Sequence, residues 1–219
     1  MQNIVLESLL PLLDSALIVT IPLTIISFIF GLILAILTAV VRLSNIKVVK
    51  QLFSLYVWIF RGTPLLVQLF IIYFGLPSIG IRLDAWTASI IALSLNTGAY
   101  ASEAIRSAIL SIDVGQWDAA TSLGMSRWMI LRRIIAPQAM RVALPPLSNS
   151  LISLVKDTSL ASSITLLEMF MTSQRIAART FEPLLMYSVV ALYYLVLSTL
   201  LTFLQQYLEK RASRFVREG

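Results

Sequence analysis

Two adjacent ionisable residues, Lys156 and Asp157, interrupt a stretch of the chain that is otherwise largely apolar. An ionisable side chain at the centre of a membrane span costs about 2.5–3.5 kcal/mol, so such residues usually have a function. A free amino acid carries an ammonium and a carboxylate, and this pair offers the opposite charge to each, with further hydroxyls from Thr158 and Ser159. Adjacent residues project about 100° apart on a helix, so the side chains of Lys156 and Asp157 cannot simply face each other. Each residue is left to bind substrate or to pair with another helix, and both alternatives stay open.

A second group of polar residues follows helical spacing. Asn96, Tyr100 and Glu103 stand at positions i, i+4 and i+7, which places them on one face of a helix, and Thr97 is next to them. Such a stripe would line a substrate cavity or hydrogen-bond to a neighbouring helix. Glu103 has a further alternative, because Arg106 at i+3 is in reach for an ordinary helix ion pair.

The third candidate is Arg61, which precedes Gly62, Thr63 and Pro64. Proline removes a backbone donor and clashes with the preceding turn, so we expect a break in the helix here. Broken helices often border transporter sites, although a purely structural hinge fits equally well. The sequence leaves open whether Arg61 lies at mid-depth or near the inner interface. Gln68, one turn after the proline, is a weaker candidate.

The composition excludes several classes of protein. Of the 219 residues, 58% are hydrophobic and 13% are charged, against about 45–50% and about 25% in soluble domains. With neither Cys nor His, disulfides, Cys/His metal sites and His-based acid–base catalysis are excluded, and no metal site is expected. No GxxxxGK[ST] loop is present, so ATP would not bind here by that route. The net charge of +6 fits the basic cytoplasmic loops of a membrane protein better than nucleic-acid binding.

The hydrophobic pattern predicts an all-α membrane protein with about five transmembrane helices, forming a single domain over residues 1–219. Its core would cover about 15–208. Glu7 and Asp14, without a Lys or Arg before residue 15, do not resemble a signal peptide. About 20 apolar residues cross the hydrocarbon core. The predicted spans are Ser15–Val41, Leu52–Gly75 with the break described above, Ala85–Ile105, Ala143–Leu166 and Pro183–Tyr207.

The basic residues predict the orientation. With the N-terminus outside and the C-terminus in the cytoplasm, twelve of the 17 Lys and Arg residues face inwards, including Lys210, Arg211, Arg214 and Arg217 of the tail. The long stretch Arg106–Arg141 then lies on the cytoplasmic side. Within it, Asp113–Met125 has the pattern of an amphipathic helix. Composition alone allows this helix to lie on the lipid bilayer or to contact a partner protein.

The pattern of the cytoplasmic stretch resembles the EAA loop of ABC importer permeases. Asp118-Ala119-Ala120 is followed after three residues by Gly124, and after nine more by Ile134-Ile135-Ala136-Pro137. The family pattern is Glu-Ala-Ala, three residues, Gly, nine residues, Ile, any residue, Leu-Pro. The chain departs from it twice, with Asp118 in place of Glu and Ala136 in place of Leu.

Further stretches are similar to the histidine/glutamine-type permeases for polar amino acids, and the resemblance covers about residues 10–210. They are 61–64 (RGTP), 96–106 (NTGAYASEAIR), 115–117 (GQW), 137–139 (PQA) and 156–160 (KDTSL). The resemblance implies a type I importer permease of the bacterial cell membrane that is not itself an enzyme. It implies an ABC ATPase that binds ATP and magnesium, an extracytoplasmic amino acid-binding protein and a second permease subunit. The cofactor expectation for this chain is therefore none.

The resemblance also assigns the loop to ATPase coupling, with Asp118, Ala119, Ala120, Gly124 and Met125 as the contact residues. We expect the two alanines to keep one helix face slim, and Gly124 to let the backbone leave the helix. Asp118 would lie near the helix start, where the dipole favours a carboxylate. The alternative is that Asp118 and Gly124 only shape the loop.

Other classes of function remain as alternatives. A stand-alone, ion-coupled secondary amino acid transporter would use Lys156, Asp157 and Glu103 as its relay, but the chain is short and shows no inverted repeat. A membrane-bound enzyme is a remote third class, since carboxylates are not clustered. The sequence does not select the amino acid, a homodimer or a heterodimer, or whether this subunit itself binds substrate.

Overall fold

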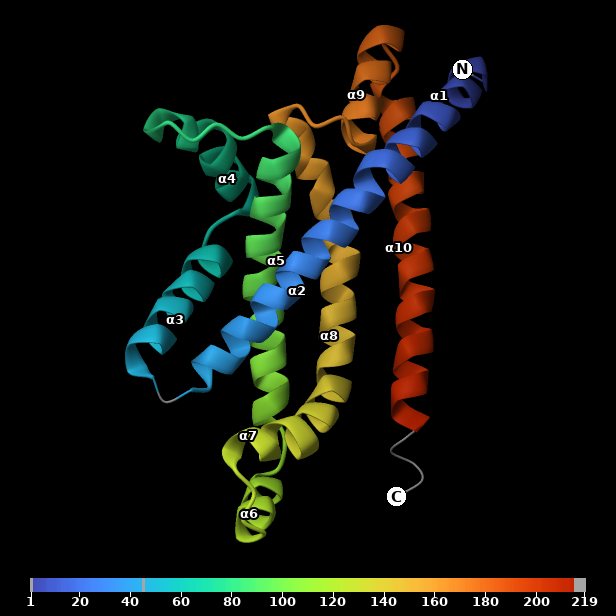
Figure 1. Ribbon diagram of the computed structural model, residues 1–219. Helices are drawn as coiled ribbons and strands as arrows, with labels where there is room; N and C mark the ends of the chain where they lie inside the picture. Colours follow the sequence, from blue (N-terminus) through green and yellow to red (C-terminus); the bar gives the residue numbers. More distant parts are fainter. Residues whose placement is uncertain (1, 45, 215–219) are drawn as a thin grey trace.

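The computed structural model describes residues 2–44 and 46–214, and these form helices joined by short turns, with no strand among them. The all-α prediction is confirmed. Long helical segments stand side by side (Figure 1), and each predicted span corresponds to one of them. They are α1 (Gln2–Ser15) with α2 (Ile21–Arg42), α3 (Lys47–Gly62) with α4 (Leu65–Phe70), α5 (Ala85–Leu110), α8 (Ala136–Asp157) and α10 (Pro183–Arg214).

The first segment is longer than predicted. A π-helical turn, Ala16–Thr20, joins α1 to α2, so the helix starts at Gln2 and not at Ser15. The predicted span Ser15–Val41 lies within this longer helical segment, and Glu7 and Asp14 belong to its first part, α1. Both side chains are exposed, while Leu12 on the other face is fully buried against α9 and α10. An amphipathic helix tolerates acids on its outer face.

The second segment breaks where the sequence predicts. Helix α3 ends at Gly62 and Thr63 is extended, and the segment Leu65–Ile79, which begins with α4, lies at an angle of 108° to α3. Proline disfavours helical backbone in the residue before it, which explains the extended Thr63. By length and composition, Ile4–Arg42 and Pro183–Arg211 qualify as membrane spans, and the bent pair is a third if its halves form one span.

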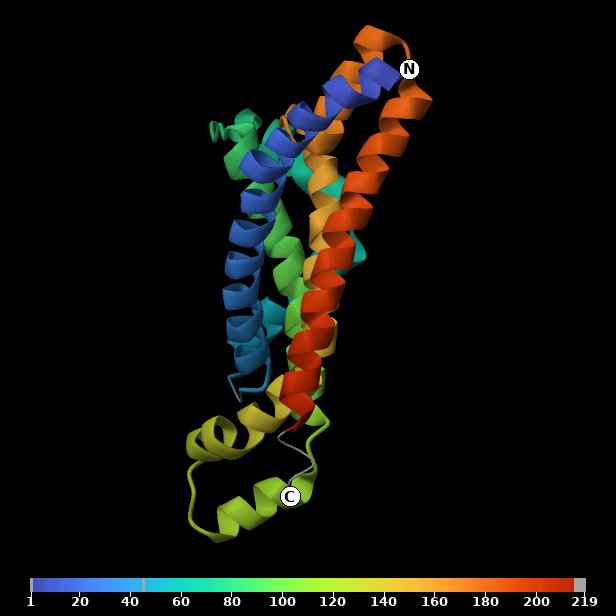
Figure 2. The same ribbon diagram turned by 90° about the vertical axis from the view of Figure 1, so that its right-hand side faces the viewer.

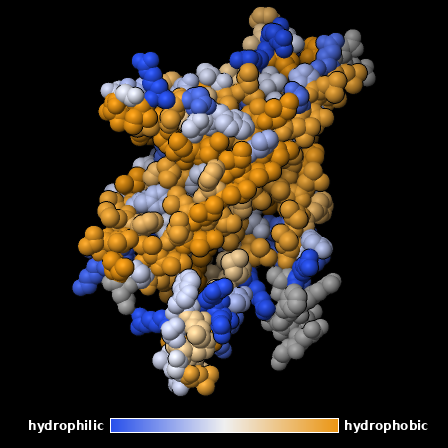
Figure 3. Space-filling view, viewed as in Figure 1, coloured by the Kyte–Doolittle hydropathy of each residue, from blue (hydrophilic) through white to orange (hydrophobic). Residues whose placement is uncertain are grey.

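Helices α5 and α8 are less apolar but long enough to span the membrane, since about 20 residues cover a hydrocarbon core of about 30 Å. The two contribute 26 and 22 residues. The surface in Figure 3 has an apolar belt across the middle of the molecule with hydrophilic residues gathered towards both ends. This distribution is the one expected of a membrane-spanning bundle.

Helices α2 and α5 cross at two glycines. A Cβ on Gly98 would lie 2.9 Å from the hydroxyl oxygen of Tyr56 and 3.2 Å from the carbonyl oxygen of Gly31. A Cβ on Gly31 would lie 3.1 Å from that of Thr97. Small residues allow such close approach of helices in membranes. The hydroxyl of Tyr56 also donates to the carbonyl of Leu95 at 2.6 Å, which ties α3 to the crossing.

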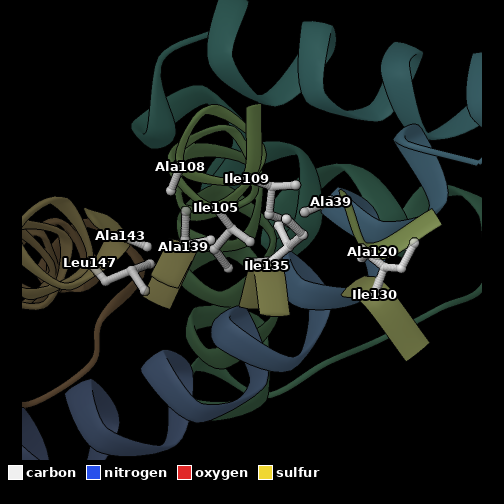
Figure 4. Close-up of a cluster of buried hydrophobic side chains, with 12 residues drawn as sticks. Ala39, Ile105, Ala108, Ile109, Ala120, Ile130, Ile135, Ala139, Ala143 and Leu147 are labelled. Carbon is white, nitrogen blue, oxygen red and sulfur yellow. The ribbon is translucent and has the colours of Figure 1, made fainter. Parts of the chain in front are cut away.

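The predicted loop Arg106–Arg141 is largely helical. Helix α5 runs on to Leu110, and α6 (Val114–Ser122) and α7 (Arg127–Ile130) follow before a π-helical turn leads into α8. Figure 2 shows these short helices beneath the bundle. A buried cluster that includes Ala120, Ile130 and Ile135 anchors them to α2, α5 and α8 (Figure 4). Helix α6 lies within the amphipathic helix predicted over Asp113–Met125, and the helical backbone from Arg127 onwards was not predicted.

The fourth span differs from its predicted form. Its α-helix ends at Asp157, and a 3-10 segment, Thr158–Ile164, completes it before Thr165 turns the chain with a φ of 70°. Lys156 and Asp157 therefore stand at the end of α8 and not in the middle of a regular helix. The fifth span starts at Pro183 as predicted and continues past Tyr207 to Arg214. Arg217 lies outside the described residues.

Helix α9 (Met169–Thr180) packs on α1 and α10 at the end of the bundle opposite α6 (Figure 1). Its N-cap, Glu168, is fully buried. The carboxylate accepts hydrogen bonds from the backbone N–H groups of Phe170 and Met171 and from the hydroxyl of Tyr194. Burial nevertheless raises the pKa of Glu168 to about 7, because the charged form loses its hydration.

We expect this buried acid to make the fold less stable as pH rises. The pKa in the folded chain lies above the ordinary value of 4.5, so the folded state holds the proton more tightly. Stability is then greatest below about pH 4.5 and falls as pH rises through 7. The expected loss between pH 5 and pH 8 is on the order of 2 kcal/mol. Thermal unfolding in detergent should show a flatter pH dependence for Glu168→Gln than for exposed Glu7→Gln, and equal slopes would contradict the assignment.

Candidate functional site

A polar cavity of about 510 Å³ lies between the α3–α4 break, α5 and α8. The break supplies an extended segment, while α5 and α8 each supply one polar helix face. The lining residues are Thr63, Pro64, Leu65, Asn96, Thr97, Tyr100, Pro146, Asn149, Ser150, Ser153 and Asp157.

Helix α8 contributes a polar stripe that the sequence reasoning missed. Asn149, Ser153 and Asp157 follow one another at intervals of four residues, with Ser150 beside them. The spacing was available in the sequence as a signal. It was overlooked because serine and asparagine are common in membrane helices as interhelical hydrogen-bond partners. The stripe places neutral donors and acceptors along the cavity and one carboxylate at its end.

Of the predicted group at residues 156–159, Asp157 alone lines the cavity. Lys156 is exposed and is absent from the lining. The Thr158 hydroxyl is buried and donates to the carbonyl of Val155 at 2.7 Å, and Ser159 donates to the carbonyl of Lys156 at 2.7 Å. Asp157 is thus the single acidic side chain at this cavity in the described part of the chain.

Asn96 and Gln68 hold the helix break together. The Asn96 side-chain amide donates to Gln68 Oε1 at 3.0 Å and to the carbonyl of Phe60 at 3.3 Å. Gln68 Nε2 donates to the carbonyls of Phe60 and Thr63 at 2.9 and 3.0 Å. The last carbonyls of a helix lack partners within it, and here these two amides supply them. Asn96 and Thr97 line the cavity, while Gln68 stays behind the wall.

Glu103 and Arg61 belong to a separate ion cluster. Glu103 Oε2 accepts from Arg42 Nη1 at 2.5 Å, Oε1 accepts from Arg106, and Arg61 Nη1 lies 4.0 Å from Oε2. The helix pair with Arg106 that the spacing allowed is present. Arg42 comes from α2, and the sequence offered no signal for that contact. Neither Glu103 nor Arg61 lines the polar cavity, although Arg61 stacks over the ring of Tyr100, which does.

The coupling residues take different positions on α6 and after it. Asp118 and Ala119 are exposed, whereas Ala120 is 2% exposed and packs within its own chain beside Ile130. The helix N-cap is Asp113, whose carboxylate accepts from the N–H of Gly115 at 2.7 Å. Asp118 therefore lies in the second turn and not near the helix start as expected.

Gly124 ends the α6 turn in the left-handed conformation, with a φ of 75°. Its N–H donates to the carbonyl of Thr121, and the N–H of Met125 donates to that of Ala120. This is the role expected for a glycine after a helix. Met125 is half-buried against the cluster that anchors the loop. In residues 2–44 and 46–214 no group of three or more Asp and Glu side chains could hold a metal ion.

Comparison with known proteins adds independent information. The family described as binding-protein-dependent transport system inner membrane component matches residues 27–214. The chain is 48% identical over 215 residues to the L-cystine transport system permease protein TcyB of Bacillus subtilis, covering 98% of this chain and 92% of that one. It is 41% identical over 197 residues to the probable amino-acid ABC transporter permease protein YckA of the same organism, covering 90% and 87%.

Solved structures agree with the sequence comparison. A crystal structure of an amino acid ABC transporter with histidines matches with a TM-score of 0.87 at 37% identity, covering 92% of this chain and 94% of that one. An inward-facing form of the MetNI methionine ABC transporter has a TM-score of 0.71 at 20% identity, covering 97% of each chain. The second match shows a shared fold.

Proposed function

The chain belongs to the family of binding-protein-dependent transport system inner membrane components and is a permease component of an ABC amino acid importer, and we propose that it moves polar amino acids by alternating access. ATP hydrolysis would take place in a partner ATPase, which binds ATP and magnesium. An extracytoplasmic binding protein would deliver the substrate, and a second permease subunit would complete the pathway in a bacterial cell membrane.

The polar cavity carries this proposal. Its single carboxylate, Asp157, matches the ammonium that every free amino acid carries, and a buried charge needs such a partner. The Asn149 amide and the Ser153 hydroxyl offer donors to the substrate carboxylate, whereas the Ser150 hydroxyl already donates to the carbonyl of Pro146. Because these groups are neutral, they suit a zwitterion better than an anion. L-Cystine is the first substrate to test, since it is the one named for the 48% identical relative.

The short helix α6 would transmit the motion of the ATPase. It stands away from the bundle and exposes Val114, Leu123 and the Asp118 carboxylate. Exposed apolar side chains beside a charge are typical of a protein contact. The buried contact between Ala120 and Ile130 joins α6 to the membrane helices, so a force on α6 would reach α8.

Reconstitution into vesicles tests the function directly. The full chain with its neighbouring ATPase and binding protein should accumulate L-cystine or another polar amino acid only when ATP is supplied on the α6 side. A proton or sodium gradient alone should drive no uptake, because the pathway would be coupled through α6. Uptake by the chain without any ATPase would instead establish the ion-coupled alternative.

A further inference from the structure

A second recess, of about 410 Å³, lies at the ion cluster between α2, α3 and α5. Its lining includes Arg42, Arg61 and Glu103, together with Ser54 and Trp58 of α3. None of these residues lines the polar cavity. The recess is therefore a separate site, and it has a different charge.

The ion cluster beside the recess carries more positive than negative charge, and Arg106 belongs to this cluster although it does not line the recess. Three guanidinium groups, those of Arg42, Arg61 and Arg106, surround the one carboxylate of Glu103. Both carboxylate oxygens are already engaged, one by Arg42 and the other by Arg106. The cluster thus has two positive charges in excess. An anion of one or two charges would balance it.

Arg61 is the guanidinium with donors to spare. It lies 4.0 Å from Glu103 Oε2, which is too far for a hydrogen bond, and it stacks over the ring of Tyr100 at 5.4 Å. In residues 2–44 and 46–214 no hydrogen bond from its guanidinium is found. A guanidinium carries five N–H donors in a planar fork that fits two oxygens of a phosphate. The side chain is 42% exposed, so a ligand can reach it.

The recess borders the exposed apolar face of α3. Helix α3 lies at the periphery (Figure 1), and its Leu55, Trp58 and Ile59 are exposed, Trp58 by 72%. Exposed apolar side chains on a membrane helix face the lipid, and tryptophan is enriched at the headgroup level. Arg42 ends α2, at the end of the bundle that carries α6. Basic pockets between helices at such a level attract anionic headgroups.

We propose that this recess binds a phosphate group, carried by an anionic phospholipid of the adjacent leaflet, with Arg61 as its principal donor. The phosphate oxygens accept hydrogen bonds from the N–H groups of the Arg61 guanidinium, and the negative charge of the phosphate balances the excess positive charge of the cluster. The acyl chains lie along the apolar face of α3. The proposal does not depend on which substrate the polar cavity carries. A free phosphate anion offers the same oxygens, so the experiment has to separate the two sources.

The test uses the fluorescence of Trp58 in the full chain, reconstituted in phosphatidylcholine vesicles. Phosphatidylglycerol with brominated acyl chains is titrated against brominated phosphatidylcholine, and the Trp58→Phe variant supplies the signal of the other tryptophans. We expect phosphatidylglycerol to be preferred about fivefold at Trp58. Arg61→Gln should abolish the preference, while the matched control Arg82→Gln, an exposed arginine at the opposite end, should keep it.

Two further arms make the outcome decisive. Arg61→Lys keeps the charge and the fold but loses the fork, so it should give an intermediate preference. Inorganic phosphate is compared with chloride at matched ionic strength. A phosphate-specific change in Trp58 fluorescence that needs Arg61, without a lipid preference, would support the phosphate site with a soluble anion as its source. Absence of both effects, or equal losses in Arg61→Gln and Arg82→Gln, would overturn the proposal.

Discussion

Asp157→Asn is expected to reduce ATP-driven amino acid uptake on the order of 30-fold or more, because removing one partner of a buried charge pair costs about 2–5 kcal/mol. The substitution keeps the size of the side chain and removes only its charge. Asp157 is half-buried at the end of α8 and is the single acid lining the polar cavity among the described residues. An amide there would leave the substrate ammonium without its counter-charge.

The measurement is the initial rate of uptake into vesicles at saturating binding protein. Asp14→Asn is the matched control, since it makes the same change at an exposed position on α1 and should leave uptake within about twofold. Co-purification with the ATPase and the thermal unfolding midpoint should be unchanged in both variants. Full uptake by Asp157→Asn would remove Asp157 from the substrate site.

Gly124→Val should uncouple the permease from its ATPase. The glycine has a φ of 75° with open space around its Cα, so the obstacle to a side chain is the backbone conformation and not a clash. A β-branched residue in this region costs about 1–2 kcal/mol, which corresponds to about a tenfold shift away from the native turn. Helix α6 would then leave its present direction. We expect ATP-driven uptake to fall at least about tenfold.

Gly80 offers a closely matched control for this prediction. It has a φ of 88° and nothing within 4 Å of an added Cβ, but it lies in the turn before α5, at the end of the bundle opposite α6. Gly80→Val carries the same backbone strain and should lower thermal stability to a similar extent. Only Gly124→Val should lose co-purification with the ATPase. Equal loss in both variants would mean that strain, and not the direction of α6, causes the defect.

Much of the fold could be predicted because membrane helices have strong sequence signals. Long apolar runs predicted the spans, and Arg61–Pro64 predicted the break between α3 and α4. The break was predictable because proline removes a backbone donor and clashes with the turn directly before it. Errors arose where a helix is polar on one face. The start of α1 and the helical segment from Arg127 to Arg141 were not predicted, because charged residues stand there among the few apolar residues that anchor them, whereas α6 lies within the predicted helix Asp113–Met125.

The candidate site was only partly predictable. Asn96, Thr97 and Asp157 line the cavity as expected, because their helical spacing or charge set them apart. Lys156 is next to Asp157 in sequence, but it is exposed and does not line the cavity. The direction of a side chain in the last turn depends on how the helix ends, which the sequence pattern did not reveal. The contact between Arg42 and Glu103 joins residues 61 positions apart. A single sequence has no spacing rule that reveals such a pair.

The glycine crossing between α2 and α5 belongs to one of two mechanical parts that together form the cavity wall. The crossing and the hydrogen bonds of Tyr56, Gln68 and Asn96 lock α2, α3, α4 and α5 into one rigid body. In the described residues no hydrogen bond joins α8 to that body, and the two meet at apolar side chains, which include Ala139 and Ala143 as well as Leu154 against Leu23 and Leu93. Packed helices of this kind slide past each other by shear. Under alternating access, Asp157 would therefore travel with the sliding helix while Asn96 stays with the stationary one.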